Sequence, residues 1–207
     1  MGRYTTAICR LCRRSGEKLM LKGSRCLTKC TMDRRNKPPG QHIHRRRRVS
    51  DRGLQLREKQ IARTTYGVME KQFRQLFTQA ERQAGITGEN LQVLLERRLD
   101  NVVYRLGFAD SRPQARQLVQ HGHILLNGRK ADVPSRLVKE GDTISWREGS
   151  TKSEYYKQLL QDIGSKSVLS WLSLDKQNLV GQVVSLPTPD DAGASFDSKT
   201  IVEYYSR

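Results

Sequence analysis

The sequence predicts an α+β protein with a basic N-terminal arm, a mostly helical domain and a small module of two helices followed by a sheet. Three observations predict this class. Residues 1–50 are rich in Arg, Gly and Pro and show little hydrophobic periodicity. From about Arg52 to Gly122, apolar residues recur at helical spacing. Short apolar runs bounded by turn residues follow, and these are typical of small strands.

The positive charge is concentrated in the first third of the chain. The formal net charge is +17, and residues 1–63 contain 19 Lys and Arg against 4 Asp and Glu. Such an excess indicates a polyanionic partner, either nucleic acid or an anionic membrane. No apolar run approaches the roughly 20 residues that cross a bilayer. The N-terminus also lacks the apolar region of a secretory signal. We therefore expect a cytoplasmic protein without a membrane partner.

The arm contains every cysteine of the chain, in two close pairs separated by 13 residues. In a chain without a secretory signal, reduced thiols are more often metal ligands than disulfides. Two such pairs can place four thiolates around one ion, and four thiolates complete a structural zinc site. An iron–sulfur cluster is the less favoured occupant, and buried or incidental thiols are the remaining alternative. The predicted ligands are Cys9, Cys12, Cys26 and Cys30.

A metal ion would give this arm the fixed shape that its few apolar residues cannot provide. His42 and His44 could be further ligands, but four cysteines already fill a tetrahedral site, so we expect these histidines to be solvated or to contact phosphate. The dense cations of the arm are predicted to bind phosphates. They include Arg13, Arg14, Arg45, Arg46, Arg47 and Arg48.

Two helices are predicted next. Residues 52–65 have a narrow apolar edge, and residues 69–84 carry Phe73, Phe77 and Ala80 at i, i+4 and i+7. Gly85 then follows the last periodic residue, as a C-terminal cap would. A further helix is predicted from Thr87, with helical spacing maintained as far as Gly107.

The small module begins with these last helical turns. Ser111 followed by Gln114 indicates a capping box, and Gly122 ends the helix that it starts. Asn127-Gly128 then indicates a hairpin, and residues 143–146 a short strand. Tyr104 is predicted either to stack on a base or to be a half-buried helix residue. We expect a cationic RNA-binding face made by Arg97, Arg98, Tyr104, Arg105, Arg112, Arg116, His121 and His123.

The remaining sequence is predicted to form a helix at 151–162 and strands at 168–174, 181–186 and 200–205. From residue 150 onward the chain is slightly acidic, which favours contact with protein over contact with nucleic acid. The sequence contains no nucleophile elbow, zinc-protease motif or phosphate-binding loop. We therefore expect neither an enzyme nor a small-molecule substrate.

Several segments resemble one known family. Residues 98–142, RLDNVVYRLGFADSRPQARQLVQHGHILLNGRKADVPSRLVKEGD, are similar to the RNA-binding module named after ribosomal protein S4. The resemblance to that bacterial small-subunit ribosomal protein family extends over the whole chain. It is carried by MGRY (1–4), CRLCRR (9–14), PPGQH (38–42), LREKQ (56–60), FRQLF (73–77), WLSLD (171–175) and EYYSR (203–207).

This resemblance implies a structural protein that binds a helix junction in the 5′ domain of 16S rRNA and nucleates small-subunit assembly. It also implies a place near the path by which mRNA enters, contact with a neighbouring small-subunit protein, and an influence on decoding accuracy. The family's metal-binding cysteines map onto the four named above, although many members lack them. The implied fold is a helical domain, 51–96 completed by 171–207, with the RNA-binding module inserted at 97–160. Residues 1–50 would form the metal-stapled arm, and residues 161–207 would pack back on the helical domain.

Two other functions are compatible with parts of the sequence. An RNA-modifying enzyme can carry the same module, but it needs a separate catalytic domain for which the chain has no room. A zinc-finger DNA-binding protein needs a recognition helix near the second cysteine pair. Pro38-Pro39-Gly40 would cut that helix short.

Overall fold

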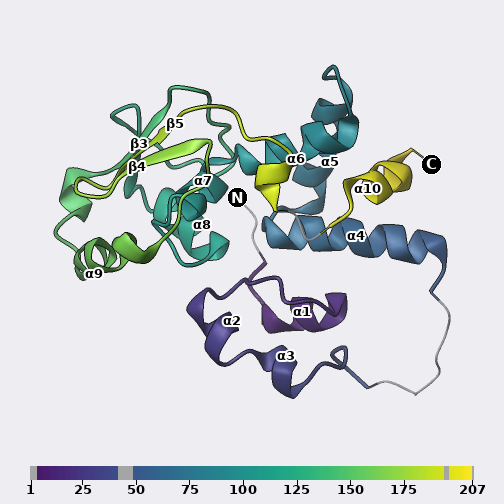
Figure 1. The fold of residues 1–207 in the computed structure, drawn as a ribbon. Helices are drawn as coiled ribbons and strands as arrows, with labels where there is room; N and C mark the ends of the chain where they lie inside the picture. Colours follow the sequence, from purple (N-terminus) through teal and green to yellow (C-terminus); the bar gives the residue numbers. More distant parts are fainter. Residues whose placement is uncertain (1–3, 42–48, 194–195, 207) are drawn as a thin grey trace. The chain divides into compact units, whose positions relative to one another are not determined.

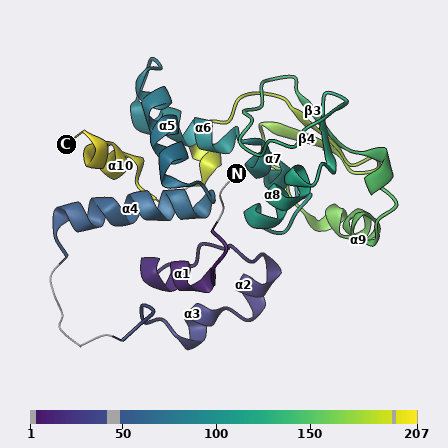
Figure 2. The ribbon, with the colours of Figure 1, turned by 180° about the vertical axis from the view of Figure 1, so that it is seen from behind.

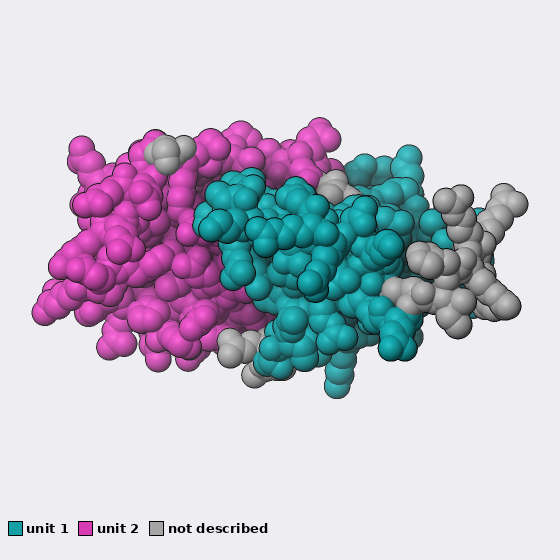
Figure 3. Space-filling view, turned by 90° about the horizontal axis from the view of Figure 1, so that it is seen from below, with its two compact units in different colours: residues 1–92, 194–207 teal, residues 93–193 magenta. Residues whose placement is uncertain are grey.

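The structure, a computed structural model, describes residues 4–41, 49–193 and 196–206. The chain divides into two compact units, shown in different colours in Figure 3. Unit 1 comprises residues 1–92 and 194–207, and unit 2 comprises residues 93–193. Unit 2 is therefore an insertion in the sequence of unit 1. It ends at residue 193 rather than at the expected residue 160.

Unit 1 is helical in the residues that the structure describes. Its two long helices, α4 and α5, confirm the helices predicted at 52–65 and 69–84. Ser50 caps α4 by accepting a hydrogen bond from the amide of Gly53. The elements are α1 (Cys9–Ser15), α2 (Ser24–Thr28), α3 (Thr31–Arg34), α4 (Asp51–Thr65), α5 (Glu70–Glu81), α6 (Thr87–Glu96), which crosses into unit 2, and α10 (Ser198–Tyr205).

The strand predicted at 200–205 is wrong, because these residues form helix α10. The β-branched and aromatic residues there favour a strand locally. Asp197 overrides this preference by capping the first turn, where its carboxylate accepts from the Lys199 amide and the Thr200 hydroxyl. The apolar side of the helix then buries Ile201. In both Figure 1 and Figure 2, α10 lies beside α4.

A buried lysine links α10 to α4 and α5. Lys59 on α4 is 4% exposed, and its ammonium lies 2.6 Å from a Glu70 carboxylate oxygen. The same ammonium lies 4.6 Å from the ring centroid of Tyr204 and 5.4 Å from that of Tyr205. The Tyr205 hydroxyl also hydrogen-bonds to Glu70, at 3.2 Å. The C-terminal helix is thus part of the core of unit 1.

Unit 2 combines helices with one antiparallel sheet of strand order β2-β1-β3-β5-β4. The hairpin predicted at Asn127-Gly128 is confirmed. Both residues have positive φ, as a type I′ turn requires. The elements are α7 (Leu99–Arg105), α8 (Arg112–Gln120), β1 (Ile124–Leu126), β2 (Arg129–Lys130), β3 (Thr143–Trp146), α9 (Glu154–Asp162), β4 (Leu172–Asp175) and β5 (Val180–Val183). Short 3-10 turns lie at Glu148–Ser150, Ile163–Ser165 and Asp190–Ala192.

Strands β4 and β5 correspond to the strands expected near 168–174 and 181–186, but they belong to unit 2. Strand β5 pairs with β3, so the sheet of the module is completed by residues beyond 160. Gly181 permits this, because a Cβ there would collide with the side chain of Leu106, the C-cap residue of α7. Of residues 161–207, the part that forms α10 belongs to unit 1, whereas residues up to 193 belong to unit 2.

The core of unit 2 is formed by α7, α8 and the sheet. Fully buried side chains include Val102, Leu106, Val119, Ile144 and Trp171. Ser111 is the N-cap residue of α8 as predicted, but its side chain makes no capping hydrogen bond. Gln114 instead accepts from the amide of Asp110. Among the described residues, no helix has the length and apolar content needed to cross a membrane.

Candidate nucleic-acid interface and cysteine pocket

The helix predicted from Thr87 to Gly107 is interrupted at Arg97-Arg98, where the chain is extended. Arg98 forms an isolated β-bridge with Leu137. The Leu99 amide donates to the Arg136 carbonyl, and the Val138 amide to the Arg97 carbonyl. This backbone pairing replaces the helical hydrogen bonds. The side chains of α7 therefore do not continue the helical face of α6.

Asp100 is the centre of a buried ion-pair network that the sequence did not predict. Arg98 donates to both of its carboxylate oxygens, at 3.1 and 2.8 Å, and Arg116 donates to one of them at 3.0 Å. Arg98 is 1% exposed and Arg116 6%. The prediction that these two arginines form part of an exposed cationic face is therefore wrong. Each guanidinium is buried because Asp100 compensates its charge.

Glu96 organises a second, adjoining network. This carboxylate is fully buried and accepts two hydrogen bonds from Arg105, at 3.0 and 2.8 Å. Asn101 donates to the Glu96 side chain and accepts from Arg112 at 2.7 Å. Arg105 also donates to the Ala192 carbonyl. These arginines thus stabilise the junction of α6, α7 and α8 from within, and their RNA contacts stay a prediction.

Tyr104 is half-buried, and the Arg112 guanidinium lies 4.7 Å from its ring centroid. One face of the ring therefore already has a cationic neighbour. Stacking of a base on Tyr104 stays a prediction. Arg97, partly exposed, donates to the Val138 carbonyl at 3.0 Å.

One group of exposed cations in unit 2 lies elsewhere, on the hairpin and the loops beside it. Helical spacing does not reveal them, whereas the pair of cations directly after Asn127-Gly128 is the sequence signal that could have. His121 is exposed and His123 half-buried at the end of α8, as part of the same region. These exposed cations are Arg129, Lys130, Arg136, Lys139 and Arg147.

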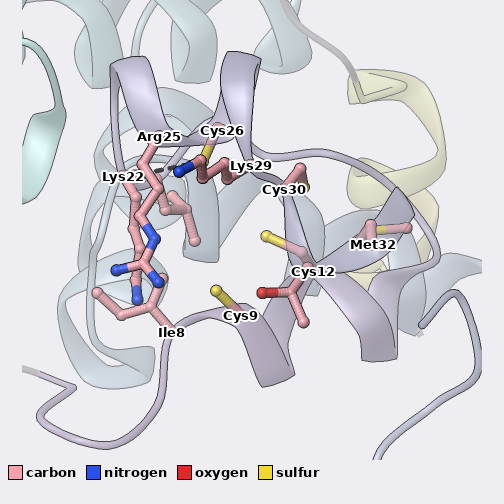
Figure 4. Close-up of a pocket in the computed structure, with 11 residues that line it drawn as sticks. Ile8, Cys9, Cys12, Lys22, Arg25, Cys26, Lys29, Cys30 and Met32 are labelled. Carbon is pink, nitrogen blue, oxygen red and sulfur yellow. Dashed lines mark hydrogen bonds between the residues drawn. The ribbon is translucent and has the colours of Figure 1, made fainter. Parts of the chain in front are cut away.

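The four cysteines line one pocket in the arm, formed by α1, α2 and the segments beside them. Figure 4 shows their sulfur atoms around this pocket, with Lys22 and Arg25 on its wall. The Lys22 amide donates to the Cys26 sulfur at 3.3 Å. Burial raises the pKa of the Cys12 thiol, and the charges of the other three cysteines raise it further. The fold thus brings together the cysteines that the sequence paired.

The metal-stapled arm itself is not confirmed. In the described ranges, no group of three or more His, Cys, Asp or Glu is arranged so that it could hold a metal ion. The kind of donor nevertheless fits zinc, because four thiols share one pocket and a backbone N–H already donates to one sulfur. The lining cations Lys22, Arg25 and Lys29 would also compensate thiolate charge.

The other predicted phosphate ligands of the arm differ in their surroundings. Arg13 donates to the carbonyls of Lys37 and Pro38, so it ties the end of the arm to α1. Arg14 is exposed. The predicted ligands Arg45, Arg46, Arg47 and Arg48, like His42 and His44, lie outside the described residues.

Comparison with known families decides the classification. The family model described as ribosomal protein S4/S9 N-terminal domain matches residues 3–96, and the S4 domain model matches residues 97–144. The chain belongs to the ribosomal protein S4 family. The family resemblance found in the sequence is thereby confirmed. The antiparallel sheet and helices of unit 2 are consistent with an S4 RNA-binding domain.

Individual members of the S4 family match this chain from end to end. Small ribosomal subunit protein uS4 of Dehalococcoides mccartyi strain CBDB1 is 56% identical over 207 residues, covering 100% of both chains. The uS4 proteins of Halothermothrix orenii and Pelotomaculum thermopropionicum are 52% and 54% identical over 208 residues, again with complete coverage. These relatives are structural ribosomal proteins rather than enzymes, in agreement with the predicted lack of catalytic activity.

Proposed function

We propose that this chain is a structural component of the small ribosomal subunit that binds 16S rRNA directly and nucleates assembly at a helix junction of the 5′ domain. The observation that carries the proposal is sequence identity of 52–56% with uS4 proteins along the whole chain. Its place of action is the cytoplasm. The proposal extends to a position near the mRNA path and to contact with a neighbouring small-subunit protein that influences translational accuracy.

The described residues support a binding mode based on shape and phosphate contacts. The Glu96 and Asp100 networks hold α7 and α8 rigidly. The exposed cations of the hairpin and the loop after it, among them Arg129 and Arg136, can then reach phosphates without reorganisation of the module. Recognition of folded RNA by phosphates and 2′-hydroxyls needs such a rigid surface more than it needs aromatic side chains.

A filter-binding assay with a transcript of the 16S rRNA 5′ domain tests the proposal. We expect at least roughly tenfold tighter binding to this transcript than to duplex DNA of equal length. Arg129→Gln with Arg136→Gln should weaken rRNA binding and lower the log–log salt slope by roughly 0.7–0.9 for each lost phosphate contact. Lys157→Gln, which removes an exposed cation from α9, is the matched control. Equal affinity for rRNA and DNA would refute a specific rRNA-binding function.

We also propose that the cysteine pocket holds one structural zinc ion, with Cys9, Cys12, Cys26 and Cys30 as ligands. An iron–sulfur cluster is the second candidate, because thiolates bind both. The bound ion would supply folding energy to the arm, whose buried residues are few. Metal analysis of freshly purified protein, with an absorption spectrum, distinguishes the two occupants.

Replacing Cys9 and Cys12 together by serine is expected to loosen the arm and spare unit 2, because the core of unit 2 is built from its own residues. Limited proteolysis should then cut within residues 4–41 at least roughly tenfold faster than in the wild type. Ser15→Ala is the control, because it shows whether any substitution near the end of α1 speeds cleavage of the arm. Uniform loss of protection in both units would contradict a local role for the cysteines.

A further inference from the structure

Cationic and protonatable side chains from three elements gather where α8 ends. His121 is the C-cap residue of α8, and the ring centroids of His121 and His123 are 6.1 Å apart. Gly122 between them has φ 73°, and a Cβ there would collide with the side chain of Lys130. Lys130 therefore lies across Gly122. Just beyond β3, the Arg147 amide donates to the His123 carbonyl at 2.8 Å.

The His123 ring is held in a defined orientation. Its Nδ1 lies 2.9 Å from the Ser150 hydroxyl oxygen, which leaves Nε2 for a ligand. Burial lowers the pKa of His123, and the charges of His121 and Arg147 lower it further. Its surroundings therefore favour the neutral form of the His123 ring when no anion is bound.

The charged groups around this ring are mostly positive. His121, the C-cap residue of α8, and Arg147, just after β3, act on the ring, and Lys130 of β2 lies against the neighbouring Gly122. Glu148 is exposed and follows Arg147 in the chain, so it offsets part of that charge. The C-terminal end of α8 also favours positive charge on a side chain placed there. A bound phosphate would supply the negative charge that a protonated His123 needs among these cations.

We propose that His121, His123, Lys130 and Arg147 form a phosphate-binding cluster and that binding of an RNA phosphate there is coupled to proton uptake by His123. This inference rests on the proposed rRNA-binding function and adds a regulation of that site by pH. The phosphate offsets the repulsion between the cations, so it stabilises the protonated form of His123 in the complex.

The coupling has a definite sign. Because the complex binds more protons than the free protein, affinity is highest at low pH and falls as pH rises through the histidine range. Coupling to protonation of His123 gives a loss of roughly three- to tenfold in affinity between pH 6 and pH 8.

The experiment measures the dissociation constant of the full chain for the 16S rRNA 5′-domain transcript at pH 6, 7 and 8, at constant ionic strength. His121→Gln with His123→Gln is expected to bind with nearly the same affinity at each pH. The matched control is His42→Gln with His44→Gln, which removes the other histidines of the chain and should retain the dependence. Lys130→Gln with Arg147→Gln should weaken binding at every pH.

Each outcome decides the proposal. A pH dependence that survives in the His121/His123 variant, or one that disappears in the His42/His44 variant, overturns it. Circular dichroism and thermal unfolding establish that each variant is folded. As a direct readout, the NMR titration of His123 must shift to higher pH when the transcript is added. Failure to bind the transcript at any pH would overturn the rRNA-binding function itself, whereas specific but pH-independent binding would overturn only the coupling.

Discussion

Replacing Asp100 by alanine is expected to lower the free energy of unfolding of unit 2 by about 3–5 kcal/mol. The reason is that Arg98 and Arg116 would remain buried without the carboxylate that accepts from both of them. An uncompensated buried charge is much more costly than the loss of an exposed ion pair, which is typically worth about 1 kcal/mol or less. Hydrogen exchange of the β3 amides, read as a function of denaturant, measures the change.

Two variants make this result specific. Asp132→Ala removes a carboxylate from an exposed position in the same unit and should change stability by less than about 0.5 kcal/mol. Replacing the whole set, as Arg98→Met, Asp100→Leu and Arg116→Met, should recover most of the loss, because no charge is then left unpaired. A loss below about 1 kcal/mol for Asp100→Ala would mean that the arginines reach solvent.

Deletion of residues 196–207 is the second large perturbation, and it should unfold much of unit 1 while unit 2 stays folded. The deletion removes Phe196 and Ile201, both buried, whose loss costs together about 3–6 kcal/mol. It also leaves Lys59 without the tyrosine rings above it. Burial alone would raise the pKa of Glu70, but the hydrogen bond and charge of Lys59, with help from Tyr205 and Arg63, lower it overall. The carboxylate therefore stabilises this arrangement above its unfolded pKa, and this stabilisation is lost as pH falls through the lower folded pKa.

Hydrogen exchange reports the two units separately in one experiment. Amides of α4 and α5 should lose their protection in the deletion variant, whereas amides of β1 and β3 keep theirs. Ile201→Ala is the matched point substitution, with an expected loss of about 2–5 kcal/mol in unit 1. Lys199→Ala, which changes an exposed residue of the same helix, should have little effect. Unchanged protection of α4 after deletion would refute the role of α10 in that core.

Local patterns in the sequence predicted much of the fold correctly. Helices α4, α5 and α8, the hairpin at Asn127-Gly128 and strand β3 depend on neighbours within one or two turns of the chain. Apolar spacing and turn residues therefore report on them directly. Family-specific segments likewise identified the ribosomal protein S4 family, because a resemblance that covers the whole chain does not depend on knowing which residues touch.

The errors involve partners distant in sequence. Residues 200–205 have strand-forming composition, yet the Asp197 cap and packing against α4 make them a helix. Strand β5 joins the sheet of unit 2 because it pairs with β3, and no local signal specifies that pairing. The residue pattern of a strand indicates that the strand will pair with another, but it does not specify which one.

The sequence by itself determined the family, the basic arm with its two cysteine pairs, and most of the individual helices. Only the tertiary structure decided which arginines are available to RNA. Arg98 and Arg129 are the same residue type, but the first is buried against Asp100 and the second is exposed on the hairpin. The sequence gives the number and order of charged residues, but the solvent exposure and ion pairing of each side chain depend on the tertiary structure. A cationic face can therefore be located only when the carboxylate partners of its arginines and lysines are known.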